Sequence, residues 1–125
     1  MPNRKPPSNG VSPTQRRGFL AEQRALDYLL ARGLVLLERN FRARCGEIDL
    51  VMRDGPGLVF VEVRYRASLT WGGAAASVTP AKQQRVRRAA QTWVAARLGS
   101  RGLPACRFDV VALEGEDLEW IRGAF

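Results

Sequence analysis

Apolar residues first recur at helical spacing in the segment that follows Ser12. Ser12 and Gln15 have the spacing of a capping box, and Pro13 suits a first helical turn. Gly33 follows the last periodic residue, where it can end a helix in the left-handed conformation. The pattern therefore predicts a helix from Ser12 to Arg32. Its buried stripe comprises Phe19, Leu26, Leu29 and Leu30.

The chain then changes to short apolar runs and to alternation, which are typical of strands. LVLL (34–37) predicts a short strand, and the basic run RNFRAR (39–44) predicts a loop. GEIDLVM (46–52) and LVFVEVRYR (58–66) predict a hairpin joined by the turn Asp54–Gly57. A loop rich in glycine and alanine comes next.

A second helix begins at Thr79-Pro80 and ends before Gly99, with the same cap-then-proline start. RFDVVALE (107–114) and LEWIRGAF (118–125) predict one long and one short final strand. The order of helix, three strands, helix and further strand predicts an α/β fold with its sheet between two helices. The apolar face of the second helix comprises Val86, Ala90, Trp93 and Val94.

The hairpin carries acids in its most strand-like part. If it folds symmetrically about its four-residue loop, Asp49 lies opposite Glu62 with the Cβ atoms about 5 Å apart. Glu47 then lies opposite Arg64.

Alternation along the two strands separates an apolar face from a polar opening. On one face the second strand presents Val59, Val61, Val63 and Tyr65, and the first presents Ile48, Leu50 and Met52. The other face of the second strand changes abruptly from apolar to charged, in the order Leu58, Phe60, Glu62, Arg64, Arg66. We therefore expect Glu47, Asp49 and Glu62 to face one polar recess.

Like charges placed directly opposite each other destabilise a sheet, so something must offset them. A divalent cation would do so, because Mg²⁺ binds through one or two carboxylates together with waters and phosphate oxygens. Internal ion pairs would do so as well, between Glu47 and Arg64 and between Glu62 and Arg42 or Arg44. The hairpin alone leaves both explanations open.

Glu22 adds a third acid, within the buried stripe of the first helix. A buried carboxylate needs a partner. An arginine, a backbone donor or the same cation could supply it.

Composition narrows the class of function. The chain has 125 residues and a net charge of +8, with a pI of about 10.9, which favours nucleic acid as a partner. Histidine is absent, which excludes Ser-His-Asp and Cys-His triads and histidine zinc sites. Two cysteines suit a reducing, cytoplasmic protein, and no apolar run predicts a membrane span or signal peptide.

Residues 1–11 are rich in proline and basic residues and predict a disordered tail, which leaves a single domain over 12–125. Basic residues cluster near the acids and on the second helix, where they could contact phosphates. The candidates for nucleic-acid binding are Arg42, Arg44, Arg64, Arg66, Lys82, Arg85 and Arg88.

Several spaced blocks of the chain resemble a known family. GFLAEQRALDYLLARGLVLLERNFR, GEIDLV, LVFVEVRYR, VTPAKQQRV, RFDVV and the terminal AF, in this order, are similar to the YraN-like family of uncharacterised bacterial proteins (uncharacterised protein family 0102). That family is in turn similar to the restriction-endonuclease-like superfamily, which includes Holliday-junction resolvases. The resemblance implies an αβββαβ core with a mixed central sheet flanked by helices.

The resemblance also implies roles for the acids. The superfamily places one acid on a strand and acid-x-lysine on the next, which here are Asp49 and Glu62, with Arg64 in the position of the lysine. Glu22 matches a helix-borne glutamate near the metal. The implied catalytic set is Asp49, Glu62, Arg64 and Glu22, and the implied ligands of Mg²⁺ or Mn²⁺ are Asp49, Glu62, Glu22 and the Val63 carbonyl.

The implied function is a metal-dependent endonuclease that acts on DNA or structured RNA, and a homodimer would be needed to cut two strands together. Arg64 departs from this pattern, because an arginine stays protonated and cannot act as a base, although it can clamp a phosphate. The alternatives are a nucleic-acid-binding module without turnover and a protein that meets an acidic protein partner.

Overall fold

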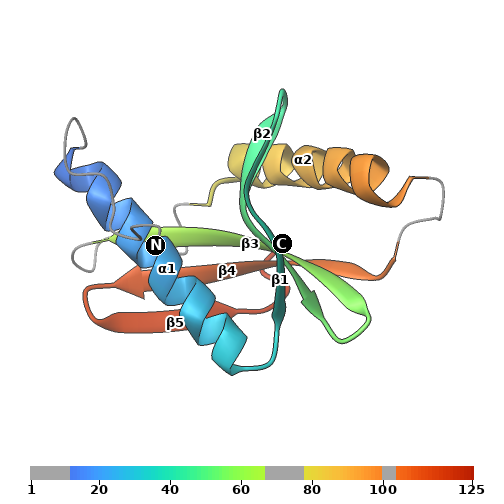
Figure 1. Ribbon diagram of the computed structural model, residues 1–125. Coiled ribbons are helices and arrows are strands. Elements are labelled where there is room, and N and C mark those ends of the chain that lie inside the picture. The colour runs from blue at the N-terminus through green and yellow to red at the C-terminus, as the bar shows by residue number, and fades with distance from the viewer. Residues whose placement is uncertain (1–11, 67–77, 100–103) are drawn as a thin grey trace, which may run out of the picture.

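A computed structural model describes residues 12–66, 78–99 and 104–125 as two helices and one five-stranded mixed sheet (Figure 1). The strands lie side by side in chain order, and each neighbouring pair is antiparallel except β3 and β4, which are parallel. The elements are α1 (Pro13–Ala31), β1 (Val35–Ala43), β2 (Gly46–Asp54), β3 (Gly57–Arg66), α2 (Pro80–Leu98), β4 (Cys106–Glu114) and β5 (Asp117–Ile121). The predicted α/β class and the predicted order are confirmed.

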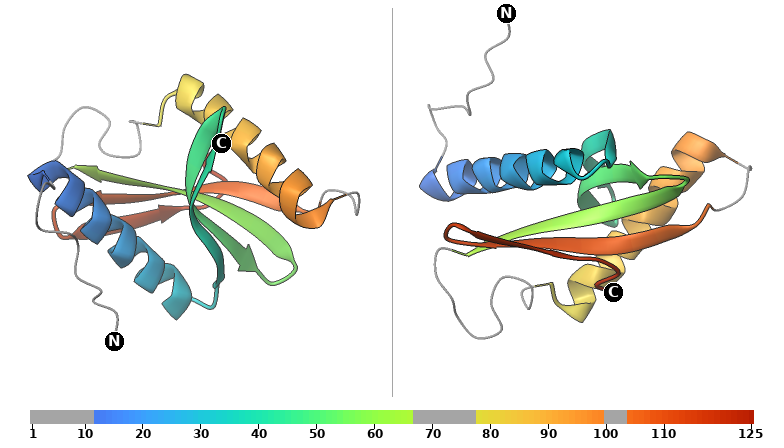
Figure 2. Two further views of the ribbon diagram at one scale, coloured as in Figure 1. Left: turned by 45° about the horizontal axis from the view of Figure 1, so that its top comes forward. Right: turned by 90° about the horizontal axis from the view of Figure 1, so that it is seen from below.

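The helices lie on opposite faces of the sheet (Figure 2). The cluster beneath α1 includes Ala21, Ala25, Leu26 and Leu29 of the helix, Leu34 after it, and Leu50, Met52, Val59, Val61, Val111 and Leu113 of the sheet. The cluster beneath α2 includes Val86, Ala89, Ala90, Trp93 and Val94 with Phe41, Ile48, Val51, Leu58 and Phe60. Neighbouring residues of one strand thus enter different clusters, as the pleat of a sheet requires.

The predicted start of α1 is confirmed in detail. The Ser12 side chain accepts a hydrogen bond from the Gln15 amide, and the Gln15 side chain accepts one from the Ser12 amide. Gly33 follows the helix with a φ of +93°. The predicted stripe is wrong at Leu30, which is 44% exposed, and Phe19 is only half-buried and joins no core cluster formed by the described residues. Ala21 is buried instead, and its small side chain allows α1 to approach the sheet closely.

The prediction for the first strand was too short. β1 continues through the residues for which a loop was expected, because Phe41 is buried under α2 and pairs with Ile48 of β2. β1 is an edge strand and is irregular, with a register shift between Leu36 and Glu38 and a positive φ at Asn40. An edge strand with one side open to solvent can be polar, which is why its sequence resembles a loop.

The β2–β3 hairpin has the predicted register from its turn, where Asp54 pairs with Gly57, as far as Leu50 and Val61. Beyond Leu50, the recorded pairing of β2 is with β1. The β1–β2 end of the sheet twists over α2 (Figure 1). Ile48 therefore packs in the α2 cluster, and not with Leu50 and Met52 as predicted.

The last segment of the chain is fastened to β4. Asp109, which is fully buried, accepts hydrogen bonds from Arg107, the Trp120 indole and the Gly123 amide. Arg107 is thus the ion-pair partner of this buried acid, at 3.0 Å. Phe125 stacks on Phe108 beside α2.

Neither α1 nor α2, the two helices in the part of the chain described, is apolar enough over a sufficient length to span a membrane. The predicted tail (1–11) and most of the Gly/Ala-rich loop (67–77) lie outside the described residues.

Gly46 sets how closely the β1–β2 turn approaches α2, and this contact can be tested. A Cβ atom at Gly46 would lie 2.8 Å from the Arg85 carbonyl oxygen. We expect Gly46→Ala to lower the free energy of unfolding by about 1–3 kcal/mol, as overpacking does. Gly18→Ala is the control, since a Cβ atom there meets nothing within 4 Å and should stabilise α1 by about 0.5–1 kcal/mol. Urea unfolding of both variants measures the difference, and equal stability of the two would contradict the close contact.

Candidate functional site

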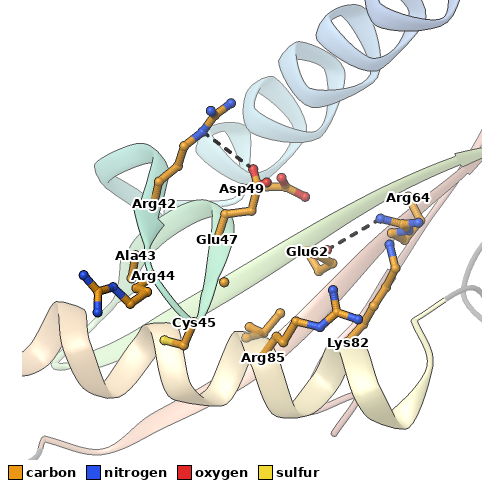
Figure 3. Close-up of a pocket in the computed structure, with 12 residues that line it drawn as sticks. Arg42, Ala43, Arg44, Cys45, Glu47, Asp49, Glu62, Arg64, Lys82 and Arg85 are labelled. Carbon is orange, nitrogen blue, oxygen red and sulfur yellow. Dashed lines mark ion pairs between the residues drawn. The ribbon is translucent and has the colours of Figure 1, made fainter.

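A cavity of about 500 Å³ lies between the β1–β2 turn, β3 and the first half of α2 (Figure 3). Its wall is rich in charge, with five basic and three acidic side chains. The lining residues are Arg42, Ala43, Arg44, Cys45, Gly46, Glu47, Asp49, Glu62, Arg64, Lys82, Arg85 and Val86. The polar recess predicted from strand alternation therefore exists, and it contains all three acids assigned to it.

Asp49 lies where β2 leaves β3, one residue beyond the last recorded pair of that ladder. Its Oδ2 atom accepts a hydrogen bond of 2.8 Å from the Val63 amide. A side chain of β2 thus takes the place that a backbone carbonyl would have in a regular ladder. This substitution holds the Asp49 carboxylate against β3.

Glu62 lies on β3 where the α2-side core ends, two residues after the fully buried Phe60. Glu62 is 8% exposed, and its Oε2 atom lies 3.6 Å from Arg64 Nη1. The Oε1 atom is buried and accepts no hydrogen bond from any described donor group, while the Asp49 carboxyl lies near enough to share a proton with Glu62. Buried carboxylate oxygens are normally paired, so this atom marks a place where a ligand could bind.

The two carboxyls perturb each other. Burial and, after it, the adjacent Asp49 carboxyl together raise the pKa of Glu62 to about 8, against the opposing charges of Arg64 and Lys82. Burial also raises the pKa of Asp49 to about 6, with the Val63 hydrogen bond opposing it and the negative charges of Glu22 and Glu47 adding to it. Paired acids with raised pKa values are typical of functional sites.

The basic side chains surround these acids. Arg42 lies 4.0 Å from Glu47 in an exposed ion pair. Within the described ranges, Arg44, Lys82 and Arg85 form no ion pair with a carboxylate. The predicted internal pairs are therefore wrong in their partners, because Glu47 lies opposite Arg42 in the β1–β2 ladder and Glu62 contacts Arg64 of its own strand.

Glu22 lies close enough to act on Asp49 but is not among the residues that line the cavity. Its carboxylate is 2.9 Å from Arg39 and accepts a hydrogen bond from Asn40. An arginine partner was one of the options for Glu22, and it is the one observed. Sequence reasoning missed Asn40, whose positive φ gives no recognisable signal in a run read as a loop.

Two of the remaining nucleic-acid candidates are not placed in the cavity. Arg88 is exposed on α2 and is not among the lining residues. The side chain of Arg66 lies outside what the structure describes.

The carboxylates of the cavity fit a hard cation that keeps most of its waters better than a cation bound entirely by protein groups. No three acidic or cysteine side chains gather as a metal-binding group within the residues described. Mg²⁺ does not need three, because it keeps several waters and binds through one or two carboxylates. Asp49 and Glu62, with the unpaired Oε1 atom between buried walls, meet that requirement.

The raised pKa of Glu62 predicts an unusual pH dependence of stability. The folded protein holds the Glu62 proton more tightly than the unfolded chain, so the free energy of unfolding should fall as the pH rises from about 4.5 to about 8. Glu62→Gln removes this loss and should be more stable than wild type at pH 8, by about 1.4 kcal/mol for each unit of the pKa shift. The two proteins should converge near pH 4.5.

Thermal melts in chelator across this pH range measure the effect. Glu119→Gln, at an exposed position of β5, controls for the loss of one formal charge. A Glu62→Gln protein less stable than wild type at pH 8 would show that contacts within the folded protein fully offset the cost of burying the charged Glu62 carboxylate.

Comparison with known proteins places this chain in a family. Residues 21–113 match the model described as "Uncharacterised protein family UPF0102". A UPF0102 protein of Alkalilimnicola ehrlichii is 53% identical over 124 residues, covering 98% of this chain and 96% of that protein. A UPF0102 protein of Ralstonia nicotianae is 57% identical over 112 residues, covering 86% and 85%. One from Klebsiella pneumoniae is 49% identical over 112 residues, covering 90% and 88%. The chain therefore belongs to the uncharacterised protein family UPF0102, as the blocks of its sequence predicted.

Proposed function

We propose that this protein binds DNA or structured RNA and hydrolyses its phosphodiester bonds with the help of Mg²⁺ or Mn²⁺. The observation that carries the proposal is the pair of buried carboxyls in a basic cavity, one of which has an oxygen without a partner. Such a pair costs free energy unless a cation or protons neutralise it. Apolar or amide side chains at the same two positions would avoid this cost.

Asp49 and Glu62 would hold the cation. When bound, it would lower the pKa of a water and neutralise the charge that develops on the phosphate. The Val63 amide keeps Asp49 oriented, and Arg64 keeps Glu62 from turning out of the cavity. Arg64 stays protonated, so its part is to clamp a phosphate oxygen and not to take a proton.

The fold supports the same proposal at a coarser level. The order α1, β1, β2, β3, α2, β4 agrees with the αβββαβ core of the restriction-endonuclease-like superfamily, and the two acids lie on its second and third strands. We include that core, and its nuclease chemistry, as part of the proposal.

The arrangement of charge favours a polyanion that crosses the cavity. Figure 3 shows Arg42 and Arg44 at the β1–β2 end and Arg64, Lys82 and Arg85 at the other, with the acids between them. Phosphates on either side of the acids would then meet basic side chains, of which Arg44, Lys82 and Arg85 form no ion pair with a described carboxylate.

A second function rests on a different observation. The Glu62–Arg64 contact already neutralises part of the carboxyl pair, and the described residues include no third ligand group. Those features favour a module of the same fold that binds nucleic acid without cleaving it.

Cation binding separates the two functions. We expect millimolar Mg²⁺ or Mn²⁺ at pH 8, where both acids can ionise, to raise the melting temperature of the protein by several degrees, since a ligand at about 100 times its Kd stabilises by about 2.7 kcal/mol. Asp49→Asn should abolish the rise, whereas Asp27→Asn, at an exposed position of α1, should keep it.

A cleavage screen then tests turnover on duplex, single-stranded and branched DNA and RNA with Mn²⁺, with Glu62→Ala as the blank. Cleavage by wild type alone supports the nuclease. A cation-induced shift that survives in Asp49→Asn, or binding without cleavage of any substrate, supports the module.

Nucleic-acid binding should depend on the cavity and not on the general charge of α2. Arg85 lines the cavity and Arg88, one turn away on the same helix, does not. We expect Arg85→Gln to weaken binding at least several-fold and to reduce the slope of log K against log salt by about 1. Arg88→Gln should have a smaller effect. Fluorescence anisotropy over a salt series gives both quantities, and equal losses would place the contact on the open face of α2.

A further inference from the structure

The chain uses its two kinds of basic residue very unequally. Of its 20 basic residues only Lys5 and Lys82 are lysines, and the rest are arginines. Lys5 belongs to the N-terminal segment outside the described residues. Lys82 lines the cavity. A requirement for charge alone could be met by arginine here, as it is elsewhere in this chain.

Lys82 is held in the first turn of α2, where its own backbone is already satisfied. Thr79 accepts the Lys82 amide through its side chain and the Gln83 amide through its carbonyl. The Gln83 side chain bonds back to the Val78 carbonyl, which fixes the approach to the helix. The backbone amides of Lys82 and Gln83 therefore both bond to the Thr79 cap. The group of this turn that can contact a ligand in the cavity is the Lys82 side chain.

The Lys82 side chain extends from α2 towards Arg64 and Glu62 (Figure 3). Its charge acts on Glu62, yet it forms no ion pair within 4 Å with any described carboxylate. Arg85, on the next turn of α2, also lacks such a pair. Two cations that share one rim of a cavity, without a carboxylate bound to either, leave a position for an anion between them.

The chemistry of that position favours a lysine. Arg64 and Arg85 already bring two planar guanidinium groups to this end of the cavity. An ammonium group is compact and carries three donors on a flexible stem, so it can contact an oxygen between two such groups. A tetrahedral phosphate accepts donors from several directions, and lysine binds it as a point charge.

We propose that Lys82 and Arg85 form a phosphate-binding subsite beside the carboxyl pair, in which the Lys82 ammonium makes the direct contact. The inference deepens the proposed function, on which it rests for the source of the phosphate. The subsite itself requires neither a nucleic acid nor turnover, so it can be tested apart from them.

Pyridoxal 5′-phosphate is a suitable probe, because it carries a phosphate and an aldehyde. The aldehyde carbon condenses with a lysine amine, releasing water, and borohydride reduces the resulting imine to a stable secondary amine. Pyridoxal, which lacks the phosphate, reports the intrinsic reactivity of each amine. Peptide mass spectrometry of the full chain reads Lys82 and Lys5 separately, so Lys5 is an internal reference.

We expect the ratio of labelling by pyridoxal phosphate to labelling by pyridoxal to be about tenfold higher at Lys82 than at Lys5, the effect of about one charge-assisted hydrogen bond. Inorganic phosphate should suppress the excess at Lys82 and leave Lys5 unchanged. Arg85→Gln should reduce it as well, whereas Arg88→Gln should not.

Equal ratios at the two lysines, or an excess that inorganic phosphate does not suppress, would overturn the subsite. Its failure is distinguishable from failure of the proposed function. Cleavage with equal ratios leaves the nuclease without this subsite, and phosphate-selective labelling without cleavage leaves the subsite on a binding module. Lys82→Arg, which keeps the charge, should still weaken nucleic-acid binding if the compact ammonium is what matters.

Discussion

The exchange of one hydrogen-bond partner at Val63 organises the whole site. Its amide donates to the side chain of Asp49, and the recorded pairing between β2 and β3 stops one residue earlier. Because β2 is then free to follow β1, the β1–β2 end can twist over α2 and enclose a cavity. The same bond fixes a carboxylate at the point of divergence, so the break in the sheet and the placement of the acid have a single cause.

The cavity contains a pair of buried acids that lowers the stability of the fold when both are charged. Two acids share a buried space, and desolvation together with their mutual repulsion raises both pKa values. Arg64 relieves part of this conflict, but it leaves one oxygen of Glu62 without a partner. Elsewhere the protein satisfies its buried acid fully, since Asp109 has three donors. Asp109 is thus a buried acid whose charge is met by donors within the fold, whereas Glu62 is a buried acid whose charge is only partly met.

Strand alternation and the symmetry of a short turn were sufficient to predict the hairpin register and to place Asp49 and Glu62 in one recess. These predictions succeeded because both depend on local geometry with a period of two residues. The partners of the charged side chains could not be found in this way. Arg42 meets Glu47 because the two lie opposite each other in the β1–β2 ladder, where the sequence pattern predicted a loop. The burial of Ile48 under α2 follows from the twist of the β1–β2 end, which depends on packing against α2. β1 was underestimated because a polar edge strand and a loop have similar composition.

The carboxyl end of the chain contributes directly to this architecture. Phe125 stacks on Phe108, Arg87 of α2 lies over both rings, and the Ala124 amide bonds to the Phe108 carbonyl. The final residues therefore connect β4 to α2, the helix that carries Lys82 and Arg85. Because Arg87 belongs to the helix that carries Lys82 and Arg85, a change in the packing of Phe108 or Phe125 would be transmitted to the basic wall of the cavity.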